Sequence, residues 1–413
     1  MLLFLSILGC RSQESVGFNT GYIEQPLDHF NPDDNRTLFR QRFLESINPG
    51  SHDSGHYSIL FLGGTGPIAS HDLLLLENIR TALNASGFIL EHRFYGESVP
   101  KLEFFIETMN EKHSFHRPRW ILCGRSYSGI LAVWANALLT NLTIAAYASS
   151  TPVHPIFDYT GYQEVITEVL YNHSEKCFND TMRVIESNLD MYMANTCNVI
   201  AEMLTWRTVR DDPGHPGFTC IDPNYLFAIH ITEKVQFSKR TDLDTLCSEI
   251  AGLAASPRPR NPTAHKIVKD QFGWFATQSE GIGQRLNSSK FAAKCLVYGL
   301  DEATVRENVA RTTRRYEEEI YPRLTNVIFT MAERDPWRKA GEYMEDRERN
   351  IRTILMQDSF VGQDFSNDSN LLNGVADEVI EFLSNATSIY LPNNARSVTL
   401  HSQLLWIVFF LLQ

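Results

Sequence analysis

One serine lies in a stretch whose pattern could make it a nucleophile. Residues 120–134 begin as an apolar run, pass through a turn of small residues around Ser126, and continue with helical spacing. A serine hydroxyl reacts readily only when a sharp strand-to-helix turn exposes it, and such a turn tolerates only small neighbours, as in Gly-x-Ser-x-Gly. Here Gly124 precedes the serine, and Ser128 followed by Gly129 stands where the second glycine is expected. The stretch predicts a nucleophile elbow; an ordinary strand, turn and helix is the alternative.

Several apolar runs before and after this stretch predict the strands that must position the serine. Residues 57–62 form a continuous apolar run that opens into the glycine loop Gly63–Pro67, and helical spacing follows over residues 71–86. Alternating strands and helices predict a mostly parallel sheet with helices on both faces. An opening hairpin is expected from residues 21–30 and 37–43. The other expected strands are residues 87–90, 144–150, 326–330 and 351–356, and a helix is expected around residues 375–383.

The middle of the chain has a different character. Residues 158–319 show longer helical patterns, few strand-like runs and proline breaks near residues 213 and 257–262. Insertions of this kind often shape the mouth of an active site. We therefore expect an α/β domain built from residues 22–157 and 320–390, interrupted by a mainly helical cap at residues 158–319.

Composition excludes one class of partner. The net charge is -12, and no run rich in lysine or arginine is present, whereas a protein that binds a phosphate backbone needs basic patches. We expect no nucleic-acid partner. No cysteine spacing fits a zinc site, and no histidine pair at ligand spacing accompanies the cysteines. We expect no metal and no cofactor.

The N-terminus and eight glycosylation sequons point to the secretory pathway, whereas the C-terminus has several interpretations. Residues 1–15 are typical of a signal peptide without its basic leader; an N-terminal strand or a truncated gene is the alternative. The apolar run at residues 404–412, within the tail 391–413, is too short to span a bilayer. It is either the removable tail of a lipid-anchor signal, a packed terminal element or an error of gene prediction. The asparagines of the sequons are Asn35, Asn84, Asn141, Asn172, Asn179, Asn287, Asn367 and Asn385.

Seven cysteines fit the same compartment. Cys10 belongs to the expected signal peptide, and Cys123 lies on the strand that enters the elbow, where a buried free thiol is the simplest interpretation. An oxidising compartment makes disulfides the expected state of the others. We expect two bridges and one unpaired thiol, with the pairing left open, among Cys177, Cys197, Cys220, Cys247 and Cys295.

Seven motifs together resemble a known family of serine exopeptidases. The resemblance covers about residues 22–385, and its family includes lysosomal Pro-Xaa carboxypeptidase, dipeptidyl peptidase II and thymus-specific serine protease. It implies an α/β-hydrolase sheet with an inserted, mainly helical cap, and cleavage next to proline or small residues near a peptide end. The motifs are residues 25–30, 63–67, 91–98, the elbow, and residues 148–153, 272–275 and 335–337.

The resemblance also implies roles for individual residues. Ser126 would be the nucleophile and Asp335 the acid of a catalytic triad, in the chain order serine, aspartate, histidine that is expected of this fold. The backbone N–H of Tyr127 and a donor from the glycine loop at Gly64 would form the oxyanion hole. The alternative is that these residues have no catalytic role: residues 63–67 would then form only a turn, and Asp335 would be part of a turn or a helix cap.

The chain departs from the family pattern at several positions. Thr65 replaces a common glutamate, Arg125 replaces a common glycine, and the residues before Asp335 are not the usual Asn-Gly. The triad histidine is expected just after residues 351–356, but its position is occupied by Phe360 or Val361, depending on the residue used to align the loop. Neither side chain accepts a proton. His92 and His401 are weak candidates for a substitute base.

Three functions follow from these observations. The first is a secreted or lysosomal, N-glycosylated serine exopeptidase that cleaves peptides, chiefly proline-containing ones, by acyl transfer through Ser126. The second is a catalytically inactive relative that acts as a binding or decoy protein; we expect this because the triad base is missing. The third is an esterase or lipase, against which the motifs of the expected cap argue. A membrane is a partner only if a lipid anchor replaces the tail, and a homodimer is an alternative to a monomer.

Overall fold

The structure of the protein is a computed structural model, in which most of the expected sheet region is described. The described residues are 18–26, 38–48, 57–64, 66–68, 73–92, 102–115, 119–157, 159–193, 223–237, 240–255, 301–343, 345–365 and 369–389. The expected signal peptide, the C-terminal tail, Thr65, His401 and the motif at residues 272–275 lie outside them.

Eight strands form one sheet in the order β1-β2-β4-β3-β5-β6-β7-β8. β1 pairs with β2 and β2 with β4 in antiparallel fashion, and every other neighbouring pair is parallel. The expected opening hairpin and the mostly parallel sheet are confirmed, and this is an α/β-hydrolase fold. The strands are β1 (Asn19–Pro26), β2 (Leu38–Ser46), β3 (Tyr57–Leu62), β4 (Ser86–Leu90), β5 (Arg119–Arg125), β6 (Thr143–Ser149), β7 (Val327–Ala332) and β8 (Ile351–Met356).

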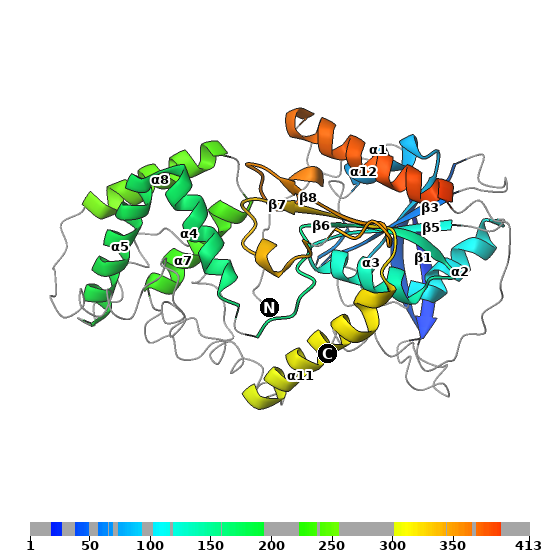
Figure 1. Ribbon diagram of the computed structural model, residues 1–413, viewed down its shortest axis with the longest axis horizontal. Helices are drawn as coiled ribbons and strands as arrows, with labels where there is room; N and C mark the ends of the chain where they lie inside the picture. The colour runs from blue at the N-terminus through cyan, green and yellow to red at the C-terminus, as the bar shows by residue number, and fades with distance from the viewer. Residues whose placement is uncertain are drawn as a thin grey trace.

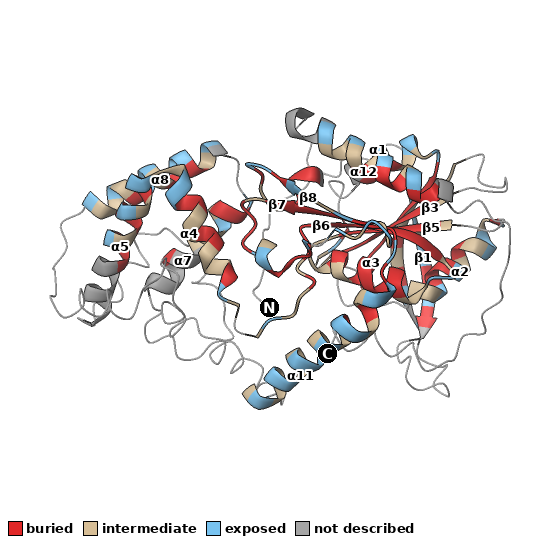
Figure 2. Ribbon diagram, in the orientation of Figure 1, coloured by how far each residue is buried: buried red, intermediate tan, exposed pale blue. Residues whose placement is uncertain are grey.

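Helices cover both faces of the sheet, because successive strand residues point to opposite sides and those of the strands β3 to β7 are buried almost throughout. The helices α1 (Leu73–Ala82) and α12 (Ser369–Ile389) pack on the face that carries Ile59, Ile121 and Ile328. The helices α2 (Leu102–Lys112) and α3 (Tyr127–Leu138) pack on the other face. Figure 1 shows these two layers, and Figure 2 shows that the strands between them are buried.

Between β6 and β7 the described chain is helical. The helices α4 (Gly161–His173), α5 (Glu175–Met193), α7 (Pro223–Phe237) and α8 (Arg240–Ala255) share a hydrophobic core of their own and lie to the left of the sheet in Figure 1. The chain returns to the sheet through α11 (Glu302–Arg315), a π-helical turn (Tyr316–Ile320) and a short 3-10 turn (Tyr321–Arg323). Tyr316 and Ile320 pack with α3 and the strands. The division into domains at residues 158 and 319 stays a prediction.

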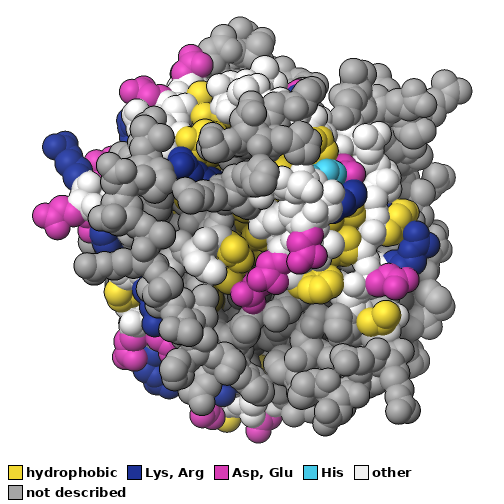
Figure 3. All heavy atoms as spheres, turned by 90° about the vertical axis from the view of Figure 1, so that its right-hand side faces the viewer, with side chains coloured by type: hydrophobic (Ala, Val, Ile, Leu, Met, Phe, Trp, Pro, Cys, Tyr) yellow, Lys and Arg dark blue, Asp and Glu magenta, His cyan; other side chains and the backbone are white. Residues whose placement is uncertain are grey.

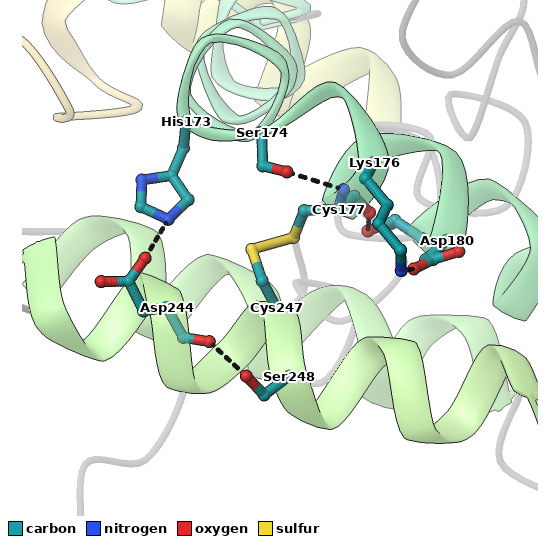
Figure 4. The surroundings of a disulfide bond; sticks show 9 residues. His173, Ser174, Lys176, Cys177, Asp180, Asp244, Cys247 and Ser248 are labelled. Carbon is teal, nitrogen blue, oxygen red and sulfur yellow. Dashed lines mark hydrogen bonds and ion pairs between the residues drawn. A yellow bond between two sulfur atoms is a disulfide. The ribbon is translucent and has the colours of Figure 1, made fainter.

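A disulfide between Cys177 of α5 and Cys247 of α8 fastens the helical segment (Figure 4). His173 at the end of α4 contacts Asp244 of α8 at 2.9 Å beside it. Cys123 is free and buried, as expected, and burial raises the pKa of its thiol. The other four cysteines lie outside the described residues, so the predicted second bridge stays a prediction.

Among the described helices, none combines the length and the apolar composition that a membrane crossing requires.

Candidate active site

Ser126 lies at the sharp turn between β5 and α3. Its backbone has φ 55° and ψ -121°, a combination that a residue other than glycine rarely adopts. The Ser126 N–H donates to the carbonyl of Ser149 on β6 at 2.8 Å, and the Ser126 carbonyl accepts from the N–H of Gly129 at 3.0 Å. Hydrogen bonds on both sides therefore hold the strained turn, and the serine is partly exposed. This is the backbone geometry of a nucleophile elbow.

The small residues around Ser126 are required by close backbone approach. A Cβ on Gly124 would lie 2.3 Å from the carbonyl oxygen of Ser128, and one on Gly129 would lie 1.9 Å from the hydroxyl of Thr151. Ser128 fits because its hydroxyl accepts from the N–H of Arg125 and donates to the Arg125 carbonyl, each at 3.0 Å. The serine at this position therefore ties the strand to the helix, a contact that glycine could not make.

The glycine loop after β3 lies beside the end of β4. The N–H of Gly63 donates to the carbonyl of Leu90 at 2.8 Å, and a Cβ on Gly63 would lie 2.9 Å from that oxygen. Gly63 is therefore fixed by packing. A Cβ on Gly64 would meet no atom of the described residues within 4 Å, so among these residues the loop is open at this position. The expected oxyanion donors, the N–H groups of Gly64 and Tyr127, stay predictions.

A buried ion pair fixes this loop. Arg42 of β2 contacts the carboxylate of Glu91, which has no exposed surface, at 2.6 Å. The Glu91 carboxylate also accepts from the N–H of Ile68 at 3.3 Å, and the Arg42 guanidinium reaches the Ile68 carbonyl at 3.5 Å. The ion pair thereby holds both the N–H and the carbonyl of Ile68, the residue that follows the glycine loop. Glu91 opens the motif at residues 91–98, but its sequence neighbours do not indicate this ion pair with Arg42.

Asp335 follows β7, and Ser126 follows β5, so both lie at the carboxyl edge of the sheet with β6 between them. Two strand spacings separate the ends of β5 and β7 by about 10 Å. Only 1% of Asp335 is exposed. Its Oδ1 accepts from the N–H of Trp337 at 2.9 Å, whereas Oδ2 is buried with no hydrogen-bond donor among the described residues. Burial raises the pKa of this carboxyl to about 7.

Aromatic side chains join the Asp335 loop to the helical segment. Trp337 stacks on Tyr159 with ring centroids 5.5 Å apart and meets Tyr162 of α4 edge-on at 5.0 Å. The Tyr159 hydroxyl donates to the carbonyl of Pro336 at 2.9 Å. Burial and the nearby Asp335 carboxyl both raise the pKa values of the two tyrosines. The segment that follows Asp335 is therefore held by contacts with residues that follow β6, and the role of Asp335 as a triad acid stays a prediction.

The loop after β8 carries the two positions at which the triad histidine was expected. The Ser359 carbonyl accepts from the N–H of Arg334 at 3.0 Å, and the Val361 N–H donates to the carbonyl of Gln236 in α7 at 3.0 Å. The Phe360 N–H donates to the side chain of Gln363 at 3.1 Å. The loop is thus bonded both to the Asp335 segment and to α7, and both Phe360 and Val361 are half-buried.

Asp364 anchors the same loop beneath the site. Its carboxylate is buried and accepts hydrogen bonds from three hydroxyls, those of Tyr147, Ser149 and Thr330, at 2.5 to 2.7 Å. These residues belong to β6 and β7. No local pattern in the sequence indicates this role of Asp364, because its partners are more than 30 positions away.

Arg125 lies against the loop that lacks the histidine. Gly362 has φ 67°, and a Cβ built on it would lie 2.5 Å from Cδ of Arg125 and 3.0 Å from Nη1. The N–H of Gly362 donates to the hydroxyl of Ser150 at 3.2 Å. The arginine that replaces the family's usual glycine therefore packs over Gly362, next to Ser126.

Among the described residues, no histidine is hydrogen-bonded to the Ser126 side chain. His92, at the end of β4, is buried and packs its ring edge-on against Tyr127 with centroids 5.4 Å apart. The His154 ring contacts the Glu342 carboxylate at 3.5 Å. The other described histidines lie just after α2 or in the helical segment between β6 and β7. Within the same residues, no group of side chains could hold a metal ion.

Known proteins resemble this chain in sequence. Thymus-specific serine protease of Mus musculus is 31% identical over 183 residues, which are 38% of this chain and 36% of that protein. Lysosomal Pro-X carboxypeptidase of Bos taurus is 30% identical over 34% of this chain and 32% of its own length. The match thus spans about a third of each of these relatives. EDA2 of Arabidopsis thaliana, described as a serine protease, is 22% identical over 80% of this chain and 78% of its own.

The family match covers most of the sheet and the elements around the candidate site. It extends over residues 25–103, 101–196 and 270–371, which include Ser126, Asp335 and the loop after β8. These segments make up more than half of the chain. The protein therefore belongs to the family of serine carboxypeptidases S28.

Proposed function

We propose that this protein binds peptide ends at the Ser126 site and hydrolyses them slowly or not at all. Family membership supports a peptide ligand, and the names of the relatives support a proline-containing one. The observation that carries the proposal is the orphaned Oδ2 of Asp335. In a working triad this oxygen would accept a hydrogen bond from the histidine.

The missing base has a large kinetic consequence. A serine hydroxyl is a weak nucleophile unless an adjacent base takes its proton. Loss of the histidine in a serine protease lowers kcat by about 10⁶-fold, or about 8 kcal/mol. The side chains of Phe360 and Val361 have no atom that can accept the hydroxyl proton of Ser126. The strained turn that presents Ser126 supports the binding of a peptide carbonyl group close to the serine.

The second candidate function is an active serine exopeptidase that uses another base. It is favoured by one contact, the edge-on packing of the His92 ring against Tyr127, the residue after the serine. In this case His92 would take the hydroxyl proton of Ser126 as its oxygen attacks the scissile carbonyl, and would pass that proton to the departing amine. Water would then hydrolyse the acyl group from Ser126.

Two measurements on the purified full chain separate these functions. Peptides that contain proline near either end are titrated calorimetrically, and the same peptides are assayed for cleavage, with Ser126→Ala as the control. We expect heat of binding without cleavage, and no labelling of Ser126 by a fluorophosphonate probe. Cleavage that Ser126→Ala abolishes would establish the active enzyme, and its loss in His92→Gln would identify the base. Absence of both binding and cleavage would overturn both functions.

We also propose that the protein is secreted or lysosomal and N-glycosylated. The lysosomal relative, the Cys177–Cys247 disulfide and the eight sequons support this route. Expression in a secretory cell should give a product whose mass falls after glycosidase treatment. A product of unchanged mass confined to the cytosol would contradict the proposal.

A further inference from the structure

Three of the sequons lie at the amino-terminal edge of the sheet. Asn84 comes two residues before β4, and Asn141 comes two residues before β6. Asn385 belongs to the last turns of α12. The carbonyl of Thr387, in the same sequon, accepts from the hydroxyl of Tyr57, the first residue of β3, at 3.3 Å.

The same carbonyl also places this sequon beside β5. It accepts from Nη1 of Arg119, the first residue of β5, at 3.4 Å. The three sequons therefore adjoin the starts of β4, β3, β5 and β6, which are successive neighbours in the sheet. Three strand spacings place the starts of β4 and β6 about 14 Å apart. Ser126 and Asp335 lie at the opposite edge.

Each of the three asparagines is exposed in the folded chain. Asn84 has φ 50°, a left-handed conformation that asparagine tolerates, and its Oδ1 accepts from the side chain of Asn48 at 2.7 Å. A glycan is attached to Nδ2, so this hydrogen bond survives the modification.

The hydroxyl residues of the three sequons are buried, in contrast to the asparagines. Ser86, Thr143 and Thr387 have between 0% and 4% of their surface exposed. Each hydroxyl is hydrogen-bonded: Ser86 accepts from Asn48 N–H, Thr143 donates to the Leu139 carbonyl, and Thr387 donates to the Ser384 carbonyl. A transferase that reads the whole sequon must therefore act before the chain folds. Because these hydroxyls form hydrogen bonds within the fold, their presence does not by itself indicate glycosylation. The experiment therefore examines the asparagines.

We propose that Asn84, Asn141 and Asn385 carry N-linked glycans that together cover the amino-terminal edge of the sheet. In each case the amide nitrogen displaces the pyrophosphate of a lipid-linked oligosaccharide at its anomeric carbon and loses a proton. Figure 3 views the molecule from this side; its coloured side chains mix both signs of charge with uncharged groups and small apolar areas.

This arrangement does not depend on the proposed peptide binding, but it rests on the proposed secretory route and N-glycosylation. Glycans are bulky and hydrated, so the covered edge is closed to a second copy of the chain. A homodimer would have to use another surface. The carboxyl edge, with Ser126 and the glycine loop, is left free for a ligand.

Site mapping tests the modification itself. The full chain is expressed in a secretory cell behind a supplied leader, so that the result does not depend on its own N-terminus. Glycosidase treatment in heavy-oxygen water then converts each modified asparagine into labelled aspartate. We expect label at all three positions. Asn84→Gln, Asn141→Gln and Asn385→Gln should each remove one glycan, whereas Asn19→Gln, an exposed asparagine outside any sequon, should remove none. An unlabelled asparagine at any of the three positions overturns the proposal.

Hydroxyl-radical footprinting tests whether the glycans cover the edge. The folded glycoprotein is compared before and after enzymatic removal of its glycans. Because the glycans are bulky, oxidation at Leu83 and Leu142, which adjoin Asn84 and Asn141, should rise about twofold or more after removal. Oxidation at Trp337, which is 40% exposed at the other edge, should not change. Equal oxidation of both leucines in the two samples would show that the edge is uncovered.

Discussion

The backbone N–H of Trp337 donates to Oδ1 of Asp335 at 2.9 Å and is the one hydrogen bond that the described residues give to this buried carboxylate. A buried acceptor without a donor is destabilising by about 1–3 kcal/mol. The carboxyl responds by holding its proton, which is why its pKa rises to about 7. Burial therefore favours the neutral, protonated form of Asp335, the residue predicted to be the triad acid.

Stability should fall with rising pH because of Asp335. In the unfolded chain the carboxyl ionises near pH 4, whereas in the folded chain it keeps its proton until about pH 7. The folded state binds more protons between these values, so stability decreases from about pH 4 to pH 7 and levels off above. At about 1.4 kcal/mol for each unit of pKa, the loss is up to about 4 kcal/mol.

The variant Asp335→Asn tests this dependence. It removes the titrating group, so it should be more stable than the unmodified chain at pH 8 and should lose that advantage toward pH 4. Urea unfolding at several pH values measures the difference. The surface variant Asp377→Asn, in an exposed part of α12, is the control and should show no such trend. A constant difference across the range would mean that Asp335 is already ionised in the folded protein.

Adding an imidazole should give Ser126 reactivity. We expect Phe360→His or Val361→His to increase the rate of fluorophosphonate labelling by about 10²-fold or more, because a positioned general base contributes 10²–10⁴-fold. The paired variants that also carry Ser126→Ala should not be labelled. The same substitution should lower the pKa of Asp335, because Oδ2 would gain a donor. If neither histidine variant is labelled faster than the unmodified chain, the loop does not reach the serine.

Replacement of Gly362 should destabilise the fold through two separable effects. Gly362→Ala places a side chain at φ 67°, which costs about 1–2 kcal/mol, and drives its Cβ into the Arg125 side chain. In an Arg125→Ala background only the backbone cost should persist. A double-mutant cycle by urea unfolding measures the coupling. Additive effects of the two substitutions would mean that Arg125 moves aside freely.

The two halves of the Arg42–Glu91 pair should respond unequally. Arg42→Met removes the cation that contacts the fully buried Glu91 carboxylate at 2.6 Å and should cost about 3–5 kcal/mol. Glu91→Gln should cost less, because 22% of the Arg42 side chain is exposed and can reach water. Unfolding of the matched surface pair variants Arg352→Met and Glu378→Gln gives the baseline, which should be below about 1 kcal/mol. Equal costs for Arg42→Met and Glu91→Gln would argue against the burial argument.

The sequence predicted what depends on neighbouring residues. The strand runs, the elbow at Ser126 and the opening hairpin follow from apolar periodicity and small residues, which are local signals. Helix α2 was not identified, although Phe105, Ile106 and Met109 are its buried face at helical spacing. The hydrogen bonds of Arg42 and Glu91 to Ile68, and the packing of Arg125 over Gly362, join residues far apart in the chain. No local pattern specifies such contacts, so they required the structure.

The Cys177–Cys247 bridge encloses 70 positions of the chain. A protease that cuts the backbone once anywhere between these cysteines would therefore leave the two fragments covalently joined. Such a nicked chain would migrate as one species without reductant and as two after reduction. Cleavage inside this interval, in an endosome for example, would process the polypeptide without releasing either half, and the sheet with Ser126 and Asp335 would stay attached to α8.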